Sequence, residues 1–210
     1  MITAPERGPE RDAALLAMLP NVPFDGWSRR ALATGLAEIG APADEADLLF
    51  PGGAVAMVEA FCDLADRQMI EGAAVLDLGD KRLPARVRSV IALRLAQQRP
   101  DKEAVRRAVA VLALPIYARQ AASCTLRTVD SIWRAAGDRS ADFSWYTKRA
   151  LLTVVYSATL LFWLRDHSED DAATLAFLDR RLAGLGRVRR LRGRAEAAMG
   201  RVLPPRRRHA

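Results

Sequence analysis

The sequence predicts an all-α protein. Alanine, leucine and arginine dominate the 210 residues, and the alternation of β-branched with polar residues that marks strands is scarce. Proline, glycine and N-capping residues divide the chain into segments of helical length. Half of the residues are hydrophobic, which is enough for one well-cored domain, or for one domain with a small appendage.

Each helix is predicted from its start and stop signals. Ser28 is a good N-cap, Gly40 a stop, and Pro100 and Pro115 each interrupt a helical pattern. The expected helices are residues 11–19, 28–39, 41–50, 54–72, 84–98, 101–114, 121–136, 143–165 and 175–185. The expected organisation is a disordered N-terminus (1–10), a helix-turn-helix-like head (11–72), a larger helical ligand-binding body (73–180), a basic amphipathic helix (181–203) and a disordered basic tail (204–210).

The first three expected helices have the rhythm of a helix-turn-helix. A DNA-reading third helix needs basic or small polar residues close to the phosphates. This one carries Asp44, Glu45 and Asp47 instead, and Arg29 and Arg30 on the preceding helix compensate only in part. We therefore interpret the head as a scaffold that does not bind DNA.

The C-terminal segment carries most of the positive charge. Residues 180–210 contain eleven arginines against Glu196 alone, whereas the rest of the chain has 21 basic and 24 acidic residues. On a helical wheel the segment separates into an apolar and a basic face, which predicts a helix that lies on an anionic membrane. The predicted membrane-binding residues are Leu185, Val188, Leu191, Met199, Arg187, Arg190 and Arg194. The alternative is a solvated basic tail with no ordered role.

The longest run without charge, residues 150–164, has 15 residues. It reaches about 22 Å as a helix, short of the roughly 30 Å core of a bilayer. We interpret it as a central helix that is buried or lines an apolar cavity. The N-terminus has no apolar signal segment, so we expect a cytoplasmic protein of bacterial type, peripheral to the inner membrane. Cys62 and Cys124 are interpreted as two small buried residues.

The start of the helix at 143–165 combines aromatic and charged residues on one face. Asp142, Trp145, Tyr146 and Arg149 fall within about 100° of one another. Phe143, Ala150, Leu151 and Val154 form a separate apolar stripe, which we expect to face the core. Tryptophan, tyrosine and arginine are frequent interface anchors, so the first face fits a partner-binding patch. The simpler alternative has Trp145 packed on a neighbouring helix and Asp142 acting only as a cap.

The sequence offers little catalytic chemistry. His167 and His209 are isolated, and no HExxH, Glu-x-x-His, GxSxG or glycine-rich phosphate loop occurs. We therefore predict a protein that is not an enzyme and that needs no metal or cofactor.

Four segments together carry a family resemblance: "WSRRALATGLAEIGAPADEADLLFPGG", "VLALP", "VDSIWRAAGDRSADFSWYTKRALL" and "TLAFLDRRL". Over residues 11–190 the chain resembles the coenzyme Q biosynthesis lipid-binding accessory family. The resemblance implies a TetR-like fold, no catalytic activity and a homodimer. It also implies an apolar cavity for isoprenoid lipids such as ubiquinone intermediates, which are presented to the di-iron demethoxyubiquinone hydroxylase at the membrane surface.

The same resemblance assigns site residues. The family's partner-binding patch corresponds here to Asp130, Ile132, Asp142, Trp145 and Tyr146. Arg149 shares their face and either joins the patch or forms a local ion pair with Asp142 or Asp138. For the lipid site, the apolar helices suggest a lining of Val109, Leu112, Leu114, Leu151, Leu152, Val155, Tyr156, Leu160 and Trp163. Residues of these types are more often ordinary core than ligand lining, so the core alternative stays open for each of them.

Two other functions fit parts of the sequence. A TetR-type transcriptional regulator with a small-molecule pocket would share the helical head and body. A basic protein that binds nucleic acid through its tail would show a steep dependence of binding on salt concentration.

Overall fold

The computed structural model describes residues 5–138 and 144–184, without the side chains of residues 144 and 145. All regular structure in these residues is helical, so the predicted all-α fold is confirmed. The predicted membrane-binding residues, Leu185 to Met199, lie outside the described residues.

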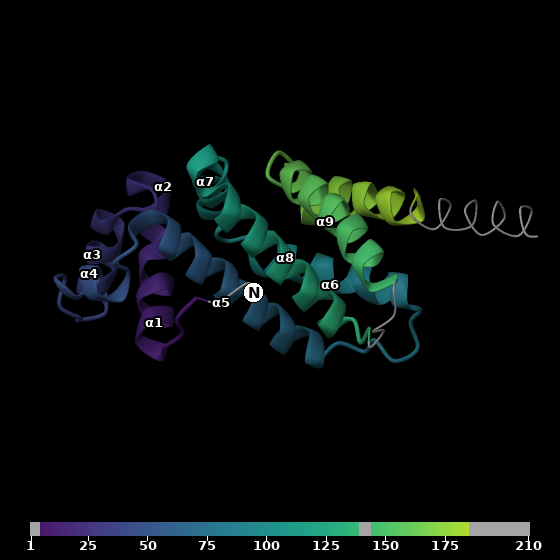
Figure 1. Cartoon of the computed structure of the whole chain (residues 1–210), viewed down its shortest axis with the longest axis horizontal. Helices are drawn as coiled ribbons and strands as arrows, with labels where there is room; N and C mark the ends of the chain where they lie inside the picture. The colour runs from purple at the N-terminus through teal and green to yellow at the C-terminus, as the bar shows by residue number, and fades with distance from the viewer. Residues whose placement is uncertain (1–4, 139–143, 185–210) are drawn as a thin grey trace, which may run out of the picture.

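The helices follow one another with short connections (Figure 1). They are α1 (Pro9–Met18), α2 (Val22–Asp25), α3 (Arg29–Glu38), α4 (Glu45–Leu49), α5 (Gly53–Ala74), α6 (Leu83–Gln97), α7 (Lys102–Leu112), α8 (Ala118–Ala135) and α9 (Ser144–Trp163). Short 3-10 turns lie at Leu19–Asn21, Pro115–Tyr117 and Glu169–Asp171, and residues 172–184 are helical. Helix α2 was not expected from the sequence, which suggested only a connection there.

The head consists of α1 to α4 and gathers at one end of the molecule (Figure 1). Ser28 caps α3 as predicted, because its Oγ accepts a hydrogen bond from the Ala31 backbone N–H at 3.2 Å. Helices α1 and α3 pack so closely at Gly35 that a Cβ atom there would lie 2.6 Å from the backbone of Ala17. Glycine at this position therefore sets the close packing of the head.

Helix α5 connects the head to the body, since it packs against α1 and also against α6 and α8. The expected boundary between head and body, at residues 72 and 73, falls in its last turn. Arg67 on α5 pairs with Asp12 on α1 at 2.7 Å and with Asp63 at 3.1 Å. Trp27 adds a second link, because its indole N–H donates to the Ala104 carbonyl of α7 at 3.0 Å.

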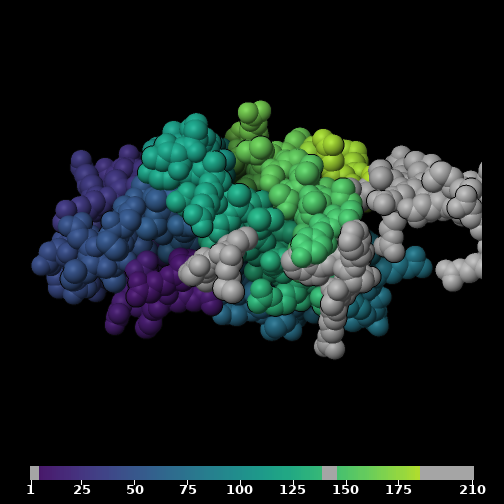
Figure 2. Space-filling model, in the orientation of Figure 1, coloured from purple at the N-terminus to yellow at the C-terminus, as the bar shows by residue number. Residues whose placement is uncertain are grey.

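Helix α9 lies at the surface of the body rather than at its centre (Figure 2). The predicted core stripe is wrong: Val154 is 68% exposed, and Ala150 and Leu151 are also exposed, while Phe143 lies outside the described residues. The buried face instead carries Leu152, Val155, Tyr156, Thr159 and Trp163. This helix is apolar on nearly every side, so its hydrophobic pattern could not indicate which side faces the core.

Within the described part of the chain, no single helix is long and apolar enough to cross a membrane. The segments Lys102–Leu112 and Pro115–Ala135 would qualify together by length and composition, but they meet at a bend of 92°.

Candidate functional site

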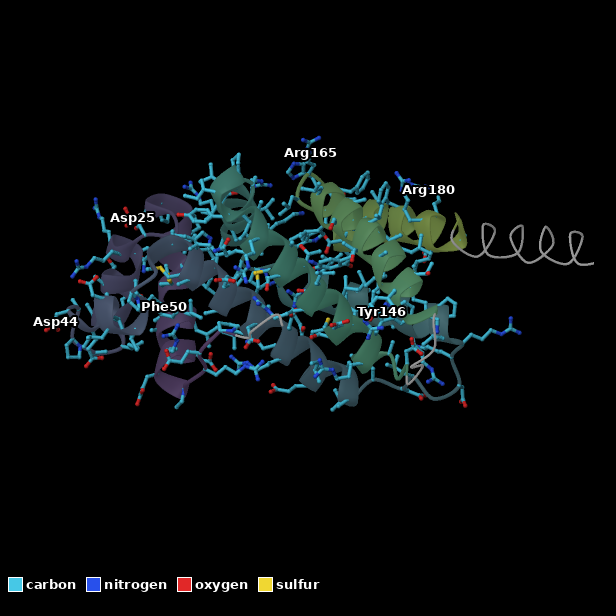
Figure 3. All side chains as sticks on the ribbon, viewed as in Figure 1. Asp25, Asp44, Phe50, Tyr146, Arg165 and Arg180 are labelled. Atoms are coloured by element: carbon cyan, nitrogen blue, oxygen red, sulfur yellow. The ribbon has the colours of Figure 1, made fainter. Side chains whose placement is uncertain are left out.

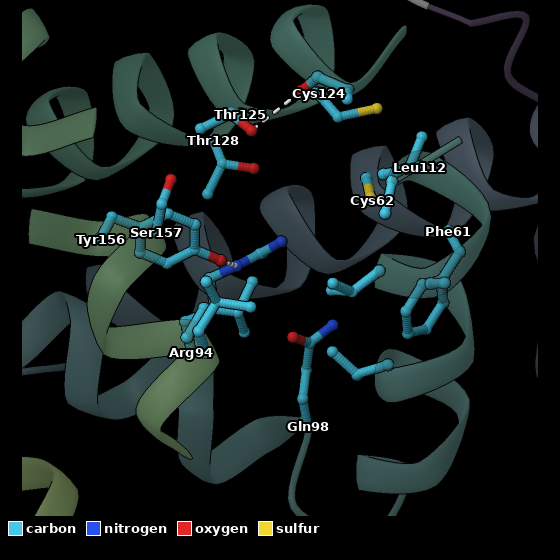
Figure 4. Close-up of a pocket in the computed structure, with 17 residues that line it drawn as sticks. Phe61, Cys62, Arg94, Gln98, Leu112, Cys124, Thr125, Thr128, Tyr156 and Ser157 are labelled. Carbon is cyan, nitrogen blue, oxygen red and sulfur yellow. Dashed lines mark hydrogen bonds between the residues drawn. The ribbon is translucent and has the colours of Figure 1, made fainter. Parts of the chain in front are cut away.

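An apolar pocket of about 340 Å³ lies in the body, among α5, α6, α7, α8 and α9 (Figure 4). Its volume is at the lower end of the range of small-molecule sites, about 300–1,000 Å³. The apolar part of its lining consists of Phe61, Val105, Ala108, Val109, Leu112, Ala113, Ala121, Leu160 and Leu161. Such a lining suits a hydrocarbon ligand, because burying apolar surface on both partners is favourable.

The pocket also has a polar end, formed by Arg94 of α6, Gln98 directly after α6, and Tyr156 of α9 (Figure 4). Arg94 is almost completely buried, and its guanidinium lies 2.8 Å from the Asp66 carboxylate. Its Nε–H donates to the Tyr156 hydroxyl at 2.9 Å, and Thr128 donates to the second Asp66 oxygen at 3.1 Å. These contacts join four helices, α5, α6, α8 and α9, around the polar end.

The electrostatics of this polar end keep Arg94 charged. Burial alone lowers the pKa of Arg94, but the neighbouring Asp66 and Tyr156 outweigh that effect and raise it. Burial raises the pKa of Tyr156, so the phenol keeps its proton at neutral pH. Burial also raises the pKa of Asp66, and Arg94 opposes that shift. We therefore describe the centre as a buried ion pair with a neutral phenol beside it.

Both cysteines line the same pocket, although 61 positions separate them in the sequence. Cys124 is buried and Cys62 is partly buried, and both are free thiols. A hydrogen bond to Cys124, together with burial, raises the pKa of the Cys62 thiol. The interpretation of two small buried residues fits their environment, but nothing in the sequence indicates that they line one pocket.

The residues expected to line a lipid site fall into three groups. Val109, Leu112, Tyr156 and Leu160 line the pocket. Leu152, Val155 and Trp163 are buried in the core and do not contribute to its lining. Leu114 is half exposed in the turn after α7, and Leu151 is partly exposed on the outer side of α9. Their role in lipid binding stays a prediction.

A second hollow, of about 770 Å³, lies beside the pocket between α7, α9 and the segment that follows α9. Val109, Ala113 and Leu161 line both spaces, so the two adjoin each other. Its other walls include Phe162 and Phe177, whose rings stack with centroids 4.6 Å apart, and the charged Arg106 and Arg165.

The expected partner-binding residues are only partly together. Tyr146 is 73% exposed on the first turns of α9, at the end of the molecule away from Asp44 (Figure 3). Arg149 pairs with Asp130 of α8, which the family resemblance also assigned to the patch. Ile132 is fully buried in the core, so its side chain is not on this surface. Asp142 and the side chain of Trp145 lie outside the described residues.

The head carries acidic residues at α4, where a DNA-reading helix was considered, and the arginines of α3 near it are paired with acidic residues. Asp44 and Asp47 are exposed, and Arg29 pairs with Asp47 at 2.5 Å. Arg30 lies 3.4 Å from Asp25. In the described residues, no group of three or more histidine, cysteine or acidic side chains is arranged to hold a metal ion.

Sequence reasoning missed the polar end of the pocket. One signal was available: Val87, Ile91, Arg94 and Gln98 recur at the spacing of one helical face. A charged and an amide side chain on the apolar face of a helix indicate a buried polar site, because such groups are seldom buried without a partner.

By its fold, this chain is an all-helical protein of TetR-like architecture. It has a small head and a larger body with a ligand-sized pocket. A TetR transcriptional regulator from Nitrosomonas europaea superposes with a TM-score of 0.67, covering 84% of this chain and 97% of that one. The two are 24% identical, so this likeness establishes the fold alone.

Sequence comparison shows that this chain is similar to the COQ9 proteins. Residues 118–189 match the COQ9 family model. The chain is 35% identical over 191 residues to "Ubiquinone biosynthesis protein COQ9, mitochondrial" of Drosophila melanogaster, covering 83% of this chain and 58% of that protein. It is 31% identical to the human protein of the same name, covering 80% and 55%. The chain is thus a relative of the COQ9 proteins, which confirms the resemblance seen in its sequence, and it spans a little over half of their length.

Proposed function

We propose that this protein is a non-enzymatic lipid-binding protein of ubiquinone biosynthesis. In this proposal it binds isoprenoid quinone intermediates at a membrane surface and presents them to the demethoxyubiquinone hydroxylase. The observation that carries the proposal is the apolar pocket in the body of a COQ9 relative. A long isoprenoid exceeds a 340 Å³ pocket, and the adjoining hollow past Val109 and Leu161 offers room for the rest of its tail.

The surface around Tyr146 is the proposed contact with the hydroxylase. An exposed tyrosine supplies a large, rigid contact area with a polar tip, which is typical of interface hot spots. Beside it, the ion pair of Arg149 with Asp130 joins α9 to α8 and holds the two helices in a fixed relation. A docked enzyme would then contact the same helices that line the pocket.

The outer side of α9 is the proposed contact between two copies of the chain. Leu151, Val154 and Leu161 recur along it at helical spacing, and all three are exposed. Contiguous exposed apolar surface usually marks an interface, and self-complementary pairs are the commonest assembly of soluble proteins. Membrane docking is assigned to the basic C-terminal segment by its sequence alone.

The alternative function, a TetR-type transcriptional regulator, rests on the shared fold. The acids of α4 and the pairing of Arg29 with Asp47 leave the head a poor match to phosphates. We therefore retain the lipid-presenting function as the conclusion.

The proposal predicts that the purified protein carries an isoprenoid lipid. Val109→Trp should lower the amount of lipid about tenfold or more, because the larger side chain overfills the pocket. Val75→Trp is the matched control, since Val75 is 85% exposed and lies outside the pocket. The measurement is mass spectrometry of lipids extracted from protein made in ubiquinone-producing cells. A wild-type protein without isoprenoid lipid, or equal lipid in Val109→Trp, would contradict the proposal.

A further inference from the structure

We propose that the pocket selects a neutral, oxygen-bearing ring and binds it ring first, with Gln98 and Tyr156 donating hydrogen bonds to the ring oxygens. The ligand class is a prenylated quinone or phenol, and fatty acids and phospholipids are disfavoured. This inference rests on the proposed function, because it assumes that the pocket holds an isoprenoid lipid.

The Gln98 amide and the Tyr156 hydroxyl are available to a ligand, because neither donates a hydrogen bond to another described residue. Gln98 is only 7% exposed and its side chain points into the pocket, and its amide meets no hydrogen-bond partner in the described part of the chain (Figure 4). Tyr156 accepts a hydrogen bond from Arg94, which leaves its own O–H to donate elsewhere. A buried amide or hydroxyl without a partner is costly, so both groups are matched best by a ligand oxygen.

Two of the other hydroxyls that line the pocket are already engaged, and the third, that of Ser157, lies on α9 next to Tyr156. Thr128 donates to Asp66 at 3.1 Å, and Thr125 donates to the Ala121 carbonyl of its own helix at 2.9 Å. The hydrogen bonds left for a ligand are therefore concentrated at the side of the pocket formed by α6 and α9. This concentration gives the pocket a polar end and an apolar end, and hence a preferred direction of binding.

The charge of the polar end decides between neutral and anionic ligands. Arg94 is the cation of this end, and Asp66 lies 2.8 Å from it, so the two charges cancel. A carboxylate or phosphate placed there would lose its hydration and face Asp66 as well as Arg94. A neutral quinone or phenol accepts the same hydrogen bonds without that desolvation cost.

The exit for the tail is the place where the pocket meets the adjoining hollow. Val109 and Leu161 line both the pocket and the adjoining hollow, and neither carries a polar side-chain atom. A ring held at Gln98 and Tyr156 would leave its tail to run between α7 and α9. The reacting ring would then be enclosed, and the partner enzyme would have to draw it out past these residues.

The test compares three ligands on the full chain by calorimetric titration in one detergent. They are a ubiquinone with two isoprene units, the hydrocarbon farnesene and oleate. Gln98→Leu and Tyr156→Phe should each weaken quinone binding about 3- to 10-fold, the value of one neutral hydrogen bond, and leave farnesene within about twofold. Gln97→Leu and Tyr117→Phe are the matched controls, since Gln97 is exposed next to Gln98 and neither residue lines the pocket.

Charge is tested with Asp66→Asn, which keeps a partner for Thr128 but leaves Arg94 uncompensated. The wild type should prefer the quinone to oleate, and this variant should shift that preference toward oleate. The inference would be overturned if Gln98→Leu and Tyr156→Phe weakened the binding of quinone and farnesene equally, or if they left quinone binding unchanged. It would also be overturned if the wild type preferred oleate. None of these results would contradict lipid binding itself. If the wild type binds neither quinone nor farnesene, the proposed function fails with it.

Discussion

Replacing Arg94 by methionine is expected to lower the free energy of unfolding by about 3–5 kcal/mol. The substitution keeps most of the side-chain volume but leaves the Asp66 carboxylate buried without its partner. It also removes the donor to the Tyr156 hydroxyl, which joins α6 to α9. The measurement is urea denaturation followed by circular dichroism at neutral pH.

Two further variants distinguish the stability lost by breaking the buried ion pair from the stability lost by removing any arginine. Arg88→Met removes a more exposed pair with Asp179 and should cost no more than about 1 kcal/mol. The double variant Arg94→Met with Asp66→Leu should recover much of the lost stability, because no buried charge remains. A loss in Arg94→Met as small as that in Arg88→Met would contradict the burial of the pair.

Truncating Trp163 to alanine should lower the free energy of unfolding by about 3–5 kcal/mol. Its ring is fully buried, and the Lys102 ammonium lies 4.8 Å from the ring centroid. The loss combines the transfer of a large apolar side chain with the cavity that remains. The measurement is again equilibrium unfolding in urea.

The control on the same helix is Leu161→Ala, which removes a side chain that is 54% exposed and should change stability by less than about 1 kcal/mol. The size of the loss in Trp163→Ala also shows whether Trp163 belongs to the core or lines a ligand site. If Trp163 lined an open ligand site, its truncation would enlarge that site and leave stability nearly unchanged, and the placement of Trp163 in the core would be wrong.

Much of the fold could be predicted because local signals mark the ends of its helices. Ser28 caps α3 as expected, and α7 ends at Leu112, two residues before the expected end and shortly before Pro115. Helix α8 begins at Ala118, a few residues before the expected position. Local rules describe such ends well, because capping depends on only a few neighbouring residues.

The orientation of α9 could not be predicted in the same way. Its apolar residues surround the helix, so several faces were equally plausible as the buried one. The structure buries Val155 and exposes Val154, and this choice is made by packing against α6 and α8. Tertiary contacts of that kind leave little trace in a helix without a polar side.

The pocket was predicted only in its general place. Val109 and Leu160 do line it, yet its polar end depends on α5, α6 and α9 bringing Asp66, Arg94 and Tyr156 together. Cys62 and Cys124 likewise lie in one pocket only because α5 packs against α8. The sequence shows that Arg94 lies on an apolar helical face, but it does not show which carboxylate neutralises it.

We propose that the protein delivers its lipid to the hydroxylase, and a reconstituted reaction tests this delivery. The measured quantity is the rate at which the demethoxyubiquinone hydroxylase converts a demethoxyquinone held in vesicles. We predict that the wild type raises this rate and that Tyr146→Ala, which should weaken docking about 30-fold, abolishes the increase while still carrying lipid. Phe24→Ala, an 84% exposed aromatic on the distant head, should behave as wild type. No increase with the wild type would contradict lipid delivery, and an equal increase with Tyr146→Ala would contradict docking through Tyr146.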